Sequence, residues 1–271
     1  MTTSAKPVAL VTGASSGMGK DIAGRLLADG YEVYAGARRL DRMADLERAG
    51  ARALALDVTA EQSILEAFEQ IIRMSGRIDV LVNAAGYGQY GALEDVPIDE
   101  ARRQMETNLF GLARVVQLCL PIMRAQGSGR IFNISSIGGK FALPLGGWYH
   151  ASKFALEGYS DALRNEVRQF GIDVVVIEPG GIASEWESIA ADAARQVSSS
   201  GPYSGMVEKF IKMQGRKAPP PSVVSDMVIK ALGARRPAIR YSGGLAARPL
   251  LFLRRHFSDR MFDRLTMLAF R

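Results

Sequence analysis

The stretch Val8-Ala9-Leu10-Val11-Thr12-Gly13-Ala14-Ser15-Ser16-Gly17-Met18-Gly19 decides how the fold begins. Its first five residues form an apolar run that is typical of a buried strand, and the glycines that follow allow a tight turn. Apolar residues at helical spacing over 17–29 predict a helix directly after that turn. The free N–H groups and the dipole at the start of a helix favour an anion. The residues expected to bind a phosphate group are therefore Gly13, Ser15, Ser16, Gly17, Met18 and Gly19.

The alternation of strand and helix continues along the chain. Further strand-like runs lie at 32–35, 53–56, 80–82, 130–134 and 173–177, with helical stretches near 42–49, 61–73, 100–124 and 149–170 between them. Apolar strands separated by helices imply a parallel sheet that is covered on both faces. Right-handed crossovers then make the sheet doubly wound. We predict the α/β class, a doubly wound and mostly parallel sheet of Rossmann type in one domain over 1–271.

The chain divides into three parts by pattern. Residues 5–183 carry the strand and helix alternation and form the expected cofactor-binding and catalytic core. The periodicity weakens over 184–221, which is rich in Ser, Gly and Pro, and long segments of this kind are either mobile lids or plain surface packing. We favour a substrate lid, because this segment follows the carboxyl end of a strand, where doubly wound sheets bind ligands. Residues 222–271 are expected to add C-terminal helices.

Composition narrows the class of protein. Among 271 residues 48% are hydrophobic and 23% are charged, with 28 Gly and 11 Pro, which excludes intrinsic disorder, a collagen-like repeat and a coiled coil. The single cysteine, Cys119, excludes an internal disulfide, and its apolar surroundings predict a buried thiol. With two histidines we expect no metal site. The sequence has no run of about 18 apolar residues and no signal-peptide pattern at its start, so we expect a cytoplasmic protein.

Positive charge gathers at the C-terminal end. The net charge is +6, with +8 over residues 230–271 and −2 over the remainder. Such a segment could meet nucleic acid, a membrane surface or an anionic substrate, or it could be a solvated helix face, which we favour. Its arginines alternate with large apolar residues, so contact with an anionic membrane is possible, although packing on the domain or on a second subunit is favoured. No nucleic-acid-binding module is present, and we expect no such partner.

Two arginines follow the second predicted strand. The sequence at this place is Gly36-Ala37-Arg38-Arg39. In a dinucleotide-binding fold, the residues here contact the adenosine ribose. A carboxylate at this place marks NAD, whereas a guanidinium can grip the 2′-phosphate of NADP. Arg38 and Arg39 could also be surface arginines that open a loop. Because the phosphate turn lies upstream, we expect NADP(H) to be favoured over NAD(H).

Two more motifs complete a recognisable set. Asn83-Ala84-Ala85-Gly86 follows the fourth strand, and Tyr149-His150-Ala151-Ser152-Lys153 opens a long helix. With these motifs in this order, the chain resembles the short-chain dehydrogenase/reductase family, in its T-G-x-x-x-G-x-G subgroup. The likeness runs from Val8 to Ser184. The C-terminal segment resembles, more weakly, the extension of steroid- and retinol-dehydrogenase-like members.

The resemblance implies four catalytic residues. Tyr149 and Lys153 are four apart and share one helix face, and a nearby ammonium together with oxidised nicotinamide should lower the pKa of the phenol. Tyr149 would then act as general acid or base, with Lys153 also holding the nicotinamide ribose. Ser136 matches the serine that hydrogen-bonds the reacting oxygen, with Ser135 as the alternative. Asn108 matches the asparagine that anchors a water in the proton relay.

The resemblance also extends the expected cofactor site. Asp57-Val58 matches the family's adenine contact, and the stretch from Pro179 to Ser184 matches the segment over the nicotinamide, with Ser184 in place of the usual threonine. The cofactor residues implied in this way are Asp57, Val58, Asn83, Ala84, Gly86, Lys153, Pro179, Gly180, Ile182 and Ser184.

The expected reaction is reversible hydride transfer between NADP(H) and a carbonyl or secondary alcohol. Large apolar residues near Tyr149 and in the lid favour a small, hydrophobic substrate that is steroid-, retinoid- or acyl-chain-like, although the same residues could be ordinary core. The expected substrate-binding residues are Phe141, Leu143, Trp148 and Trp186. The family likeness also implies a homodimer or homotetramer.

Two other functions remain open. The same fold could serve as a non-catalytic NADP sensor. The run Gly13-Ala14-Ser15-Ser16-Gly17 also satisfies G-x-S-x-G, the nucleophile elbow of α/β-hydrolases, so Ser15 could be an esterase nucleophile. An esterase would need a histidine later in the chain, either His150 or His256. It would also need an oxyanion-hole loop from an earlier strand, and only one strand precedes Ser15, which counts against this function.

Overall fold

Seven parallel strands form the centre of the protein. The computed structural model describes residues 6–214 and 217–270. The strands lie side by side in the order β3-β2-β1-β4-β5-β6-β7, and every pair is parallel. The predicted doubly wound sheet is confirmed. The strands are β1 (Val8–Thr12), β2 (Glu32–Ala37), β3 (Arg52–Ala55), β4 (Val80–Asn83), β5 (Gly129–Ile134), β6 (Ile172–Pro179) and β7 (Arg240–Gly243).

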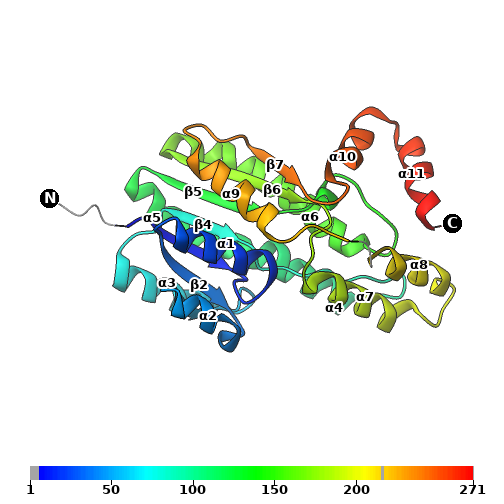
Figure 1. Cartoon of the computed structure of the whole chain (residues 1–271), viewed down its shortest axis with the longest axis horizontal. Helices are drawn as coiled ribbons and strands as arrows, with labels where there is room; N and C mark the ends of the chain where they lie inside the picture. The colour runs from blue at the N-terminus through cyan, green and yellow to red at the C-terminus, as the bar shows by residue number, and fades with distance from the viewer. Residues whose placement is uncertain (1–5, 215–216, 271) are drawn as a thin grey trace.

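Helices cover both faces of this sheet (Figure 1). Along β1, Leu10 belongs to the apolar cluster under α3, α5 and α6, whereas Val11 belongs to the cluster under α1, α2 and α9. Successive side chains of a strand point to opposite faces, so a fully apolar strand builds two cores. The helices are α1 (Gly17–Ala28), α2 (Ala44–Arg48), α3 (Glu61–Ser75), α4 (Ile98–Met105), α5 (Gly111–Gln126), α6 (Gly147–Val167), α7 (Glu185–Ser198), α8 (Ser204–Gln214), α9 (Ser222–Gly233), α10 (Ala247–His256) and α11 (Asp259–Met267).

The turn between β1 and α1 depends on two glycines. Gly13 has φ +72°, and a Cβ there would lie 2.7 Å from the backbone nitrogen of Ala85. A Cβ on Gly19 would lie 2.5 Å from the carbonyl oxygen of Gly13. Any side chain at either position would therefore push α1 away from the ends of β1 and β4. This close approach brings the start of α1 to the carboxyl edge of the sheet.

The structure contains several elements that the sequence pattern did not predict. The predicted helix over 100–124 is α4 and α5 joined through a π-helical turn, η2 (Glu106–Phe110). The segment expected as a lid, 184–221, contains α7 and α8, which lie beyond the carboxyl edge of the sheet (Figure 1). The C-terminal segment contributes the edge strand β7 as well as the expected helices. Cys119 is fully buried in α5, as predicted, and burial raises the pKa of its thiol.

No helix within residues 6–214 and 217–270 combines the length and the apolar character that crossing a bilayer requires.

Candidate active site

Two adjacent cavities lie at the carboxyl edge of the sheet. The first, of about 180 Å³, is lined by the turn before α1 and by the ends of β2, β3 and β4. The second, of about 280 Å³, lies between the end of β6, the start of α6 and the segments around α8 and α10. Met18, Ser184 and Trp186 line both cavities. This pair of cavities could hold a polar ligand in the first and an apolar molecule in the second, with the two in contact where the cavities adjoin.

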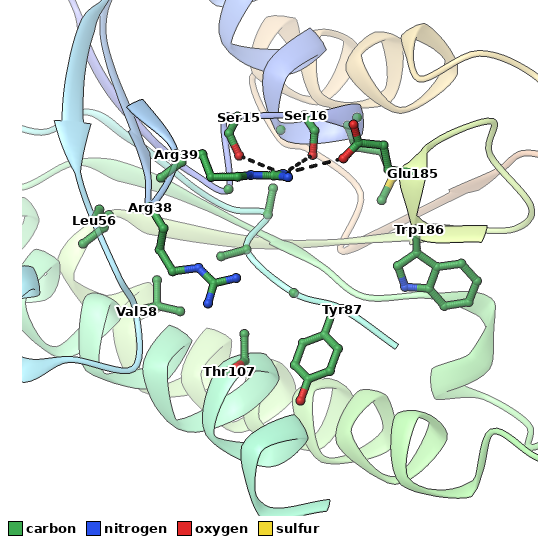
Figure 2. Close-up of a pocket in the computed structure, with 18 of the residues that line it drawn as sticks. Ser15, Ser16, Arg38, Arg39, Leu56, Val58, Tyr87, Thr107, Glu185 and Trp186 are labelled. Atoms are coloured by element: carbon green, nitrogen blue, oxygen red, sulfur yellow. Dashed lines mark hydrogen bonds and ion pairs between the residues drawn. The ribbon is translucent and has the colours of Figure 1, made fainter. Parts of the chain in front are cut away.

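The first cavity contains the glycine turn and both arginines (Figure 2). Ser16 is the N-cap residue of α1, yet its side chain caps no helix N–H group. Its hydroxyl oxygen instead accepts a hydrogen bond from Arg39 at 3.3 Å, and the Ser15 hydroxyl accepts one at 3.4 Å. Arg38 points into the cavity from the end of β2. The open helix start and the two guanidiniums make this cavity suited to anionic groups.

A carboxylate from the segment 184–221 also reaches this site. Glu185, the first residue of α7, forms ion pairs with Arg42 at 2.6 Å and with Arg39 at 3.6 Å. Sequence reasoning missed this residue, because it lies more than 140 positions after its partners. An anionic ligand bound in the first cavity would compete with Glu185 for the guanidinium of Arg39.

Most of the predicted cofactor residues line the first cavity. They are Gly13, Ser15, Ser16, Gly17, Met18, Gly19, Arg38, Arg39, Asp57, Val58, Ala84, Gly86 and Ser184. Pro179, Gly180 and Ile182 line the second cavity instead. Asn83 and Lys153 line neither cavity. The side-chain nitrogen of Asn83 donates to Asn133 Oδ1 at 2.9 Å, because the two residues face each other in the register of β4 and β5. Tyr87 and Thr107 also line the first cavity and were not anticipated.

Tyr149 and Ser136 come together in the wall of the second cavity. The Ser136 hydroxyl donates to the Pro179 carbonyl oxygen at 3.4 Å, while Ser135, the alternative, buries its hydroxyl without a described partner. Lys153 lies one turn after Tyr149, and its Nζ is 5.9 Å from the centre of the tyrosine ring. The same nitrogen donates to the carbonyl oxygen of Ile134 at 2.9 Å. The arrangement places a phenol, a hydroxyl and a buried amine around the end of β5.

Burial dominates the titration of these two groups. It raises the pKa of Tyr149 to about 12, although the nearby Ser136 hydroxyl opposes this rise. The sequence led us to expect a lowered pKa, but in the protein alone the loss of solvent around the ring outweighs the other effects. Burial also lowers the pKa of Lys153 to about 8, against the opposing charge of Glu157. At neutral pH the phenol therefore holds its proton and can donate it.

Asn108 lies in the π-helical turn η2 and is buried. Its Oδ1 accepts from the backbone nitrogen of Tyr87 at 3.1 Å. Its Nδ2 donates to the Tyr87 carbonyl oxygen at 3.0 Å and to Ser152 Oγ at 3.0 Å. The amide thus fixes the chain after β4 to the helix that carries Tyr149 and Lys153.

The second cavity is mainly apolar. Phe141, Leu143 and Trp186 line it, whereas Trp148 does not. Trp148 precedes Tyr149 in α6, so its side chain is turned by about 100° around the helix from the phenol. The lining residues that were not assigned to the site in advance include Tyr90, His150, Phe210, Leu245, Leu250 and Phe270.

An aromatic group surrounds the phenol of Tyr149. Tyr90 stacks on Phe210 with ring centres 4.7 Å apart, and the Trp186 ring lies 5.2 Å from the Tyr149 ring. These contacts bring α7 and α8 against α6, the helix that carries Tyr149. They shield the Tyr149 hydroxyl from bulk water on that side.

A cluster of ionic groups lies one turn further along α6, beside β6 and β7. Glu157, one turn after Lys153, accepts from Lys140 at 2.6 Å and from Arg240 at 3.0 Å. Glu178 of β6 lies 3.3 Å from Arg240 and 3.6 Å from Lys140. Burial, with the neighbouring charge of Glu157, raises the pKa of Glu178. The two cations thus hold two nearly inaccessible carboxylates behind the candidate site.

The esterase alternative finds no support in this geometry. The Ser15 hydroxyl contacts a guanidinium, not an imidazole. His150 uses its Nδ1 to bind the carbonyl oxygen of Gly138 at 2.9 Å, and the His256 ring packs against Phe252 in α10 at a tilt of 43°. The serine of a nucleophile elbow needs a histidine within hydrogen-bond reach, and neither imidazole is held for that purpose.

Comparison with known proteins decides the family. A family model described as short chain dehydrogenase matches residues 7–193. The chain belongs to the short-chain dehydrogenase/reductase family. A probable short-chain type dehydrogenase/reductase of Helicobacter pylori is 36% identical, with 97% of each chain covered. A 3-ketodihydrosphingosine reductase of Bacteroides thetaiotaomicron is 47% identical over 174 residues, which cover 64% of this chain and 63% of that protein.

Solved structures agree with this assignment. A short-chain dehydrogenase from Streptomyces avermitilis has a TM-score of 0.82 at 34% identity, covering 97% of this chain and 96% of that one. An actinorhodin polyketide ketoreductase solved with NADPH has a TM-score of 0.72 at 32% identity, covering 86% and 92%. Among the structural neighbours several hold NADP and one holds NAD. The chain is an oxidoreductase of a family that uses a nicotinamide cofactor.

The residues present fit such a cofactor. The start of α1 is left open by its N-cap serine, and two guanidiniums stand beside it. The cavity then continues to Ser184 and Trp186, where the second cavity with Tyr149 begins. The phosphates and ribose would be held by the glycine turn, Arg38, Arg39 and Lys153, and the redox chemistry would be that of the nicotinamide.

Proposed function

We propose that this protein catalyses the NADP(H)-dependent interconversion of a ketone and a secondary alcohol on a hydrophobic, acyl-chain-like molecule. The observation that carries the proposal is that the phenol of Tyr149 and the hydroxyl of Ser136 share the wall of an apolar cavity beside the phosphate turn. A non-catalytic sensor would have no use for a protonated phenol at this junction.

The chain's own residues would handle the proton. When bound, the nicotinamide supplies or accepts the hydride. The Tyr149 hydroxyl donates its proton to the carbonyl oxygen in reduction and takes it back in oxidation. Ser136 stabilises the charge that develops on that oxygen. Lys153, in its ammonium form, favours the phenolate that is left behind and also holds the cofactor ribose.

The preference for NADP(H) is supported by the two arginines of the first cavity. Arg39 reaches across Ser15 and Ser16, and Arg38 points into the same space (Figure 2). A dianionic phosphate would gain charge-assisted hydrogen bonds there. Glu185 would give up its 3.6 Å contact with Arg39 and keep its 2.6 Å contact with Arg42.

Replacing Arg39 tests this preference. In Arg39→Asp we expect the ratio of kcat/KM for NADPH to that for NADH to fall about 100-fold, because a charge-assisted bond is lost and a repulsive carboxylate is added. Initial rates with each cofactor measure the ratio. Arg42→Gln is the matched control: it removes the other guanidinium paired with Glu185, and the ratio should stay within about threefold of the unmodified protein. An unchanged ratio in Arg39→Asp would mean that another group reads the cofactor.

The substrate class is supported by the second cavity and by one relative. The lining is dominated by aromatic and aliphatic side chains from β6, α6, α8 and α10. Its hydrophobic character suits a long alkyl or acyl chain. The similarity to a 3-ketodihydrosphingosine reductase favours a keto group on such a chain over a steroid or a retinoid.

A homologous series of ketones tests the substrate class. With NADPH saturating, kcat/KM should rise about fourfold for each CH₂ added to a 3-keto alkyl chain until the cavity is filled, because each buried CH₂ contributes about 0.8 kcal/mol. The rate of NADPH oxidation measures this slope. Phe210→Ser should flatten it, since Phe210 forms part of the apolar wall. A flat series, or fastest turnover on short polar ketones, would contradict the proposal.

Two further expectations remain proposals. The segment 184–221 would serve as the substrate lid, because Trp186 and Phe210 close over Tyr149. A homodimer or homotetramer is supported by two exposed phenylalanines, Phe110 of η2 and Phe154 of α6, on the long helices that the family likeness assigns to subunit contact.

A further inference from the structure

The C-terminal helices α10 and α11 expose large apolar side chains. Phe252 of α10 is 60% exposed, and Leu268, just after α11, is 59% exposed. Met261 and Leu265 of α11 are also exposed; they are four residues apart and so share one side of that helix. The inner side carries Phe262, which packs against Phe141 with ring centres 5.2 Å apart. The inner side of these helices therefore packs against the domain, whereas the apolar side chains on their outer side have no covering element among the residues that the structure describes.

The same outer surface carries unbalanced positive charge. Arg248, Arg255, Arg260 and Arg264 are exposed and form no ion pair with any residue in the described part of the chain. Arg254 differs, because it is paired with Asp259 at 2.5 Å. Four guanidiniums interspersed with aromatic and aliphatic side chains make this surface amphipathic in the manner of interfacial helices. We name it the α10–α11 surface.

We propose that the α10–α11 surface binds an anionic lipid bilayer at its headgroup region. Each arginine would lie near lipid phosphates, and the exposed apolar side chains would reach the acyl boundary. A second copy of the chain fits less well, because a two-fold contact through this surface would place arginines against arginines. A nucleic acid would also match the charge, but it would leave the apolar side chains without a partner.

The α10–α11 surface lies next to the second cavity, so binding to a bilayer would bring that cavity close to the lipid. Leu245 is 40% exposed and also lines the second cavity, together with Leu250 and Phe270 from the same C-terminal segment. Backbone hydrogen bonds between Leu245 and Gly181, at 2.9 and 3.1 Å, fix this rim to the end of β6. A molecule with a long alkyl chain would thus meet apolar side chains both on the surface and in the cavity wall. The inference goes beyond the proposed function and can be tested without substrate or cofactor.

Vesicle flotation with the full chain tests the proposal. Phosphatidylcholine vesicles that contain phosphatidylglycerol should carry the protein upward, pure phosphatidylcholine vesicles should carry much less, and added salt should release it. Arg255→Gln with Arg260→Gln should weaken the partition coefficient about 25-fold, about fivefold for each arginine. Phe252→Ser with Leu265→Ser should weaken it at least tenfold.

A matched control lies at the other end of the molecule, on α3 (Figure 1). Arg73 and Ile72 are both exposed there, and Arg73→Gln with Ile72→Ser should leave vesicle binding unchanged. Three results would overturn the proposal. They are no binding to anionic vesicles, equal loss in the α3 control, and a dimer in light scattering that Phe252→Ser with Leu265→Ser converts to monomer while vesicle binding persists. Ketone reduction by the same variants, measured in detergent, reports separately on the proposed function.

Discussion

Tyr149→Phe is expected to lower kcat for ketone reduction by about 10³-fold and to leave NADPH binding within about twofold of its original value. The substitution removes one oxygen and keeps the ring, which packs against Tyr90 and Trp186 at 5.7 and 5.2 Å. Burial raises the pKa of this phenol to about 12, so near neutral pH it is a proton donor, and phenylalanine has no proton to give. Steady-state rates and a fluorescence titration with NADPH measure the two quantities.

Tyr159 provides the matched control for this substitution. It lies on the same helix, α6, and burial likewise raises the pKa of its phenol to about 12. Its ring packs on the apolar cluster under α3 and α5, away from both cavities. Tyr159→Phe should therefore keep kcat within about twofold. If Tyr149→Phe retained more than a tenth of the activity, another group would have to supply the proton.

Much of the fold follows from the sequence because its main signals are local. The run Val8–Thr12 is apolar throughout, and a strand buried on both faces requires this. The strand β7 escaped prediction for the opposite reason: Arg240–Gly243 has no apolar run and is only half-buried at the edge of the sheet. Residues 184–221 carry prolines and serines that obscure the helical spacing of α7 and α8.

The candidate site divides in the same way. Groups near one another in sequence, such as Tyr149 and Lys153, were placed together by helix geometry alone. Groups that meet across the fold were not: Glu185 reaches Arg39, and Phe270 reaches the cavity of Tyr149, only because α7 and the C-terminal segment pack against the sheet edge. Trp148 was predicted to bind substrate because it precedes Tyr149 in the sequence. It does not line the cavity, because successive side chains of a helix point in directions about 100° apart.

The ionic cluster that joins α6 to β6 and β7 could not be predicted from sequence patterns either, because its members are far apart in the chain. Arg240 of β7 donates to Glu157 Oε2 at 3.0 Å and to Asp161 Oδ2 at 2.8 Å, and it lies 3.3 Å from Glu178. The side chains of Glu157 and Glu178 are each only 5% exposed, so these carboxylates depend on their cations. They join α6 to β6 and β7. The integrity of the site therefore depends on charges outside it.

Arg240→Met is expected to lower the free energy of unfolding by about 3 kcal/mol and Tm by about 8 °C, because it leaves two buried carboxylates with Lys140 as their remaining close cation. Urea and thermal unfolding measure these changes. The loss should shrink as the pH falls. The pKa of Glu178 is already raised by burial and by Glu157, so the folded variant takes up a proton at a higher pH than the unfolded chain and is stabilised relative to it below that pH.

Arg195→Met is the control for charge removal alone. Arg195 pairs with Asp192 at 2.7 Å on α7, but both side chains are more than half exposed, so its loss should change the free energy of unfolding by less than about 0.5 kcal/mol. If Arg240→Met were as mild as this control, or if its loss did not depend on pH, then the carboxylates of Glu157 and Glu178 would not rely on Arg240. Because Glu157 lies one turn after Lys153, a destabilised cluster should also reduce kcat at temperatures well below the new Tm, whereas Arg195→Met should not.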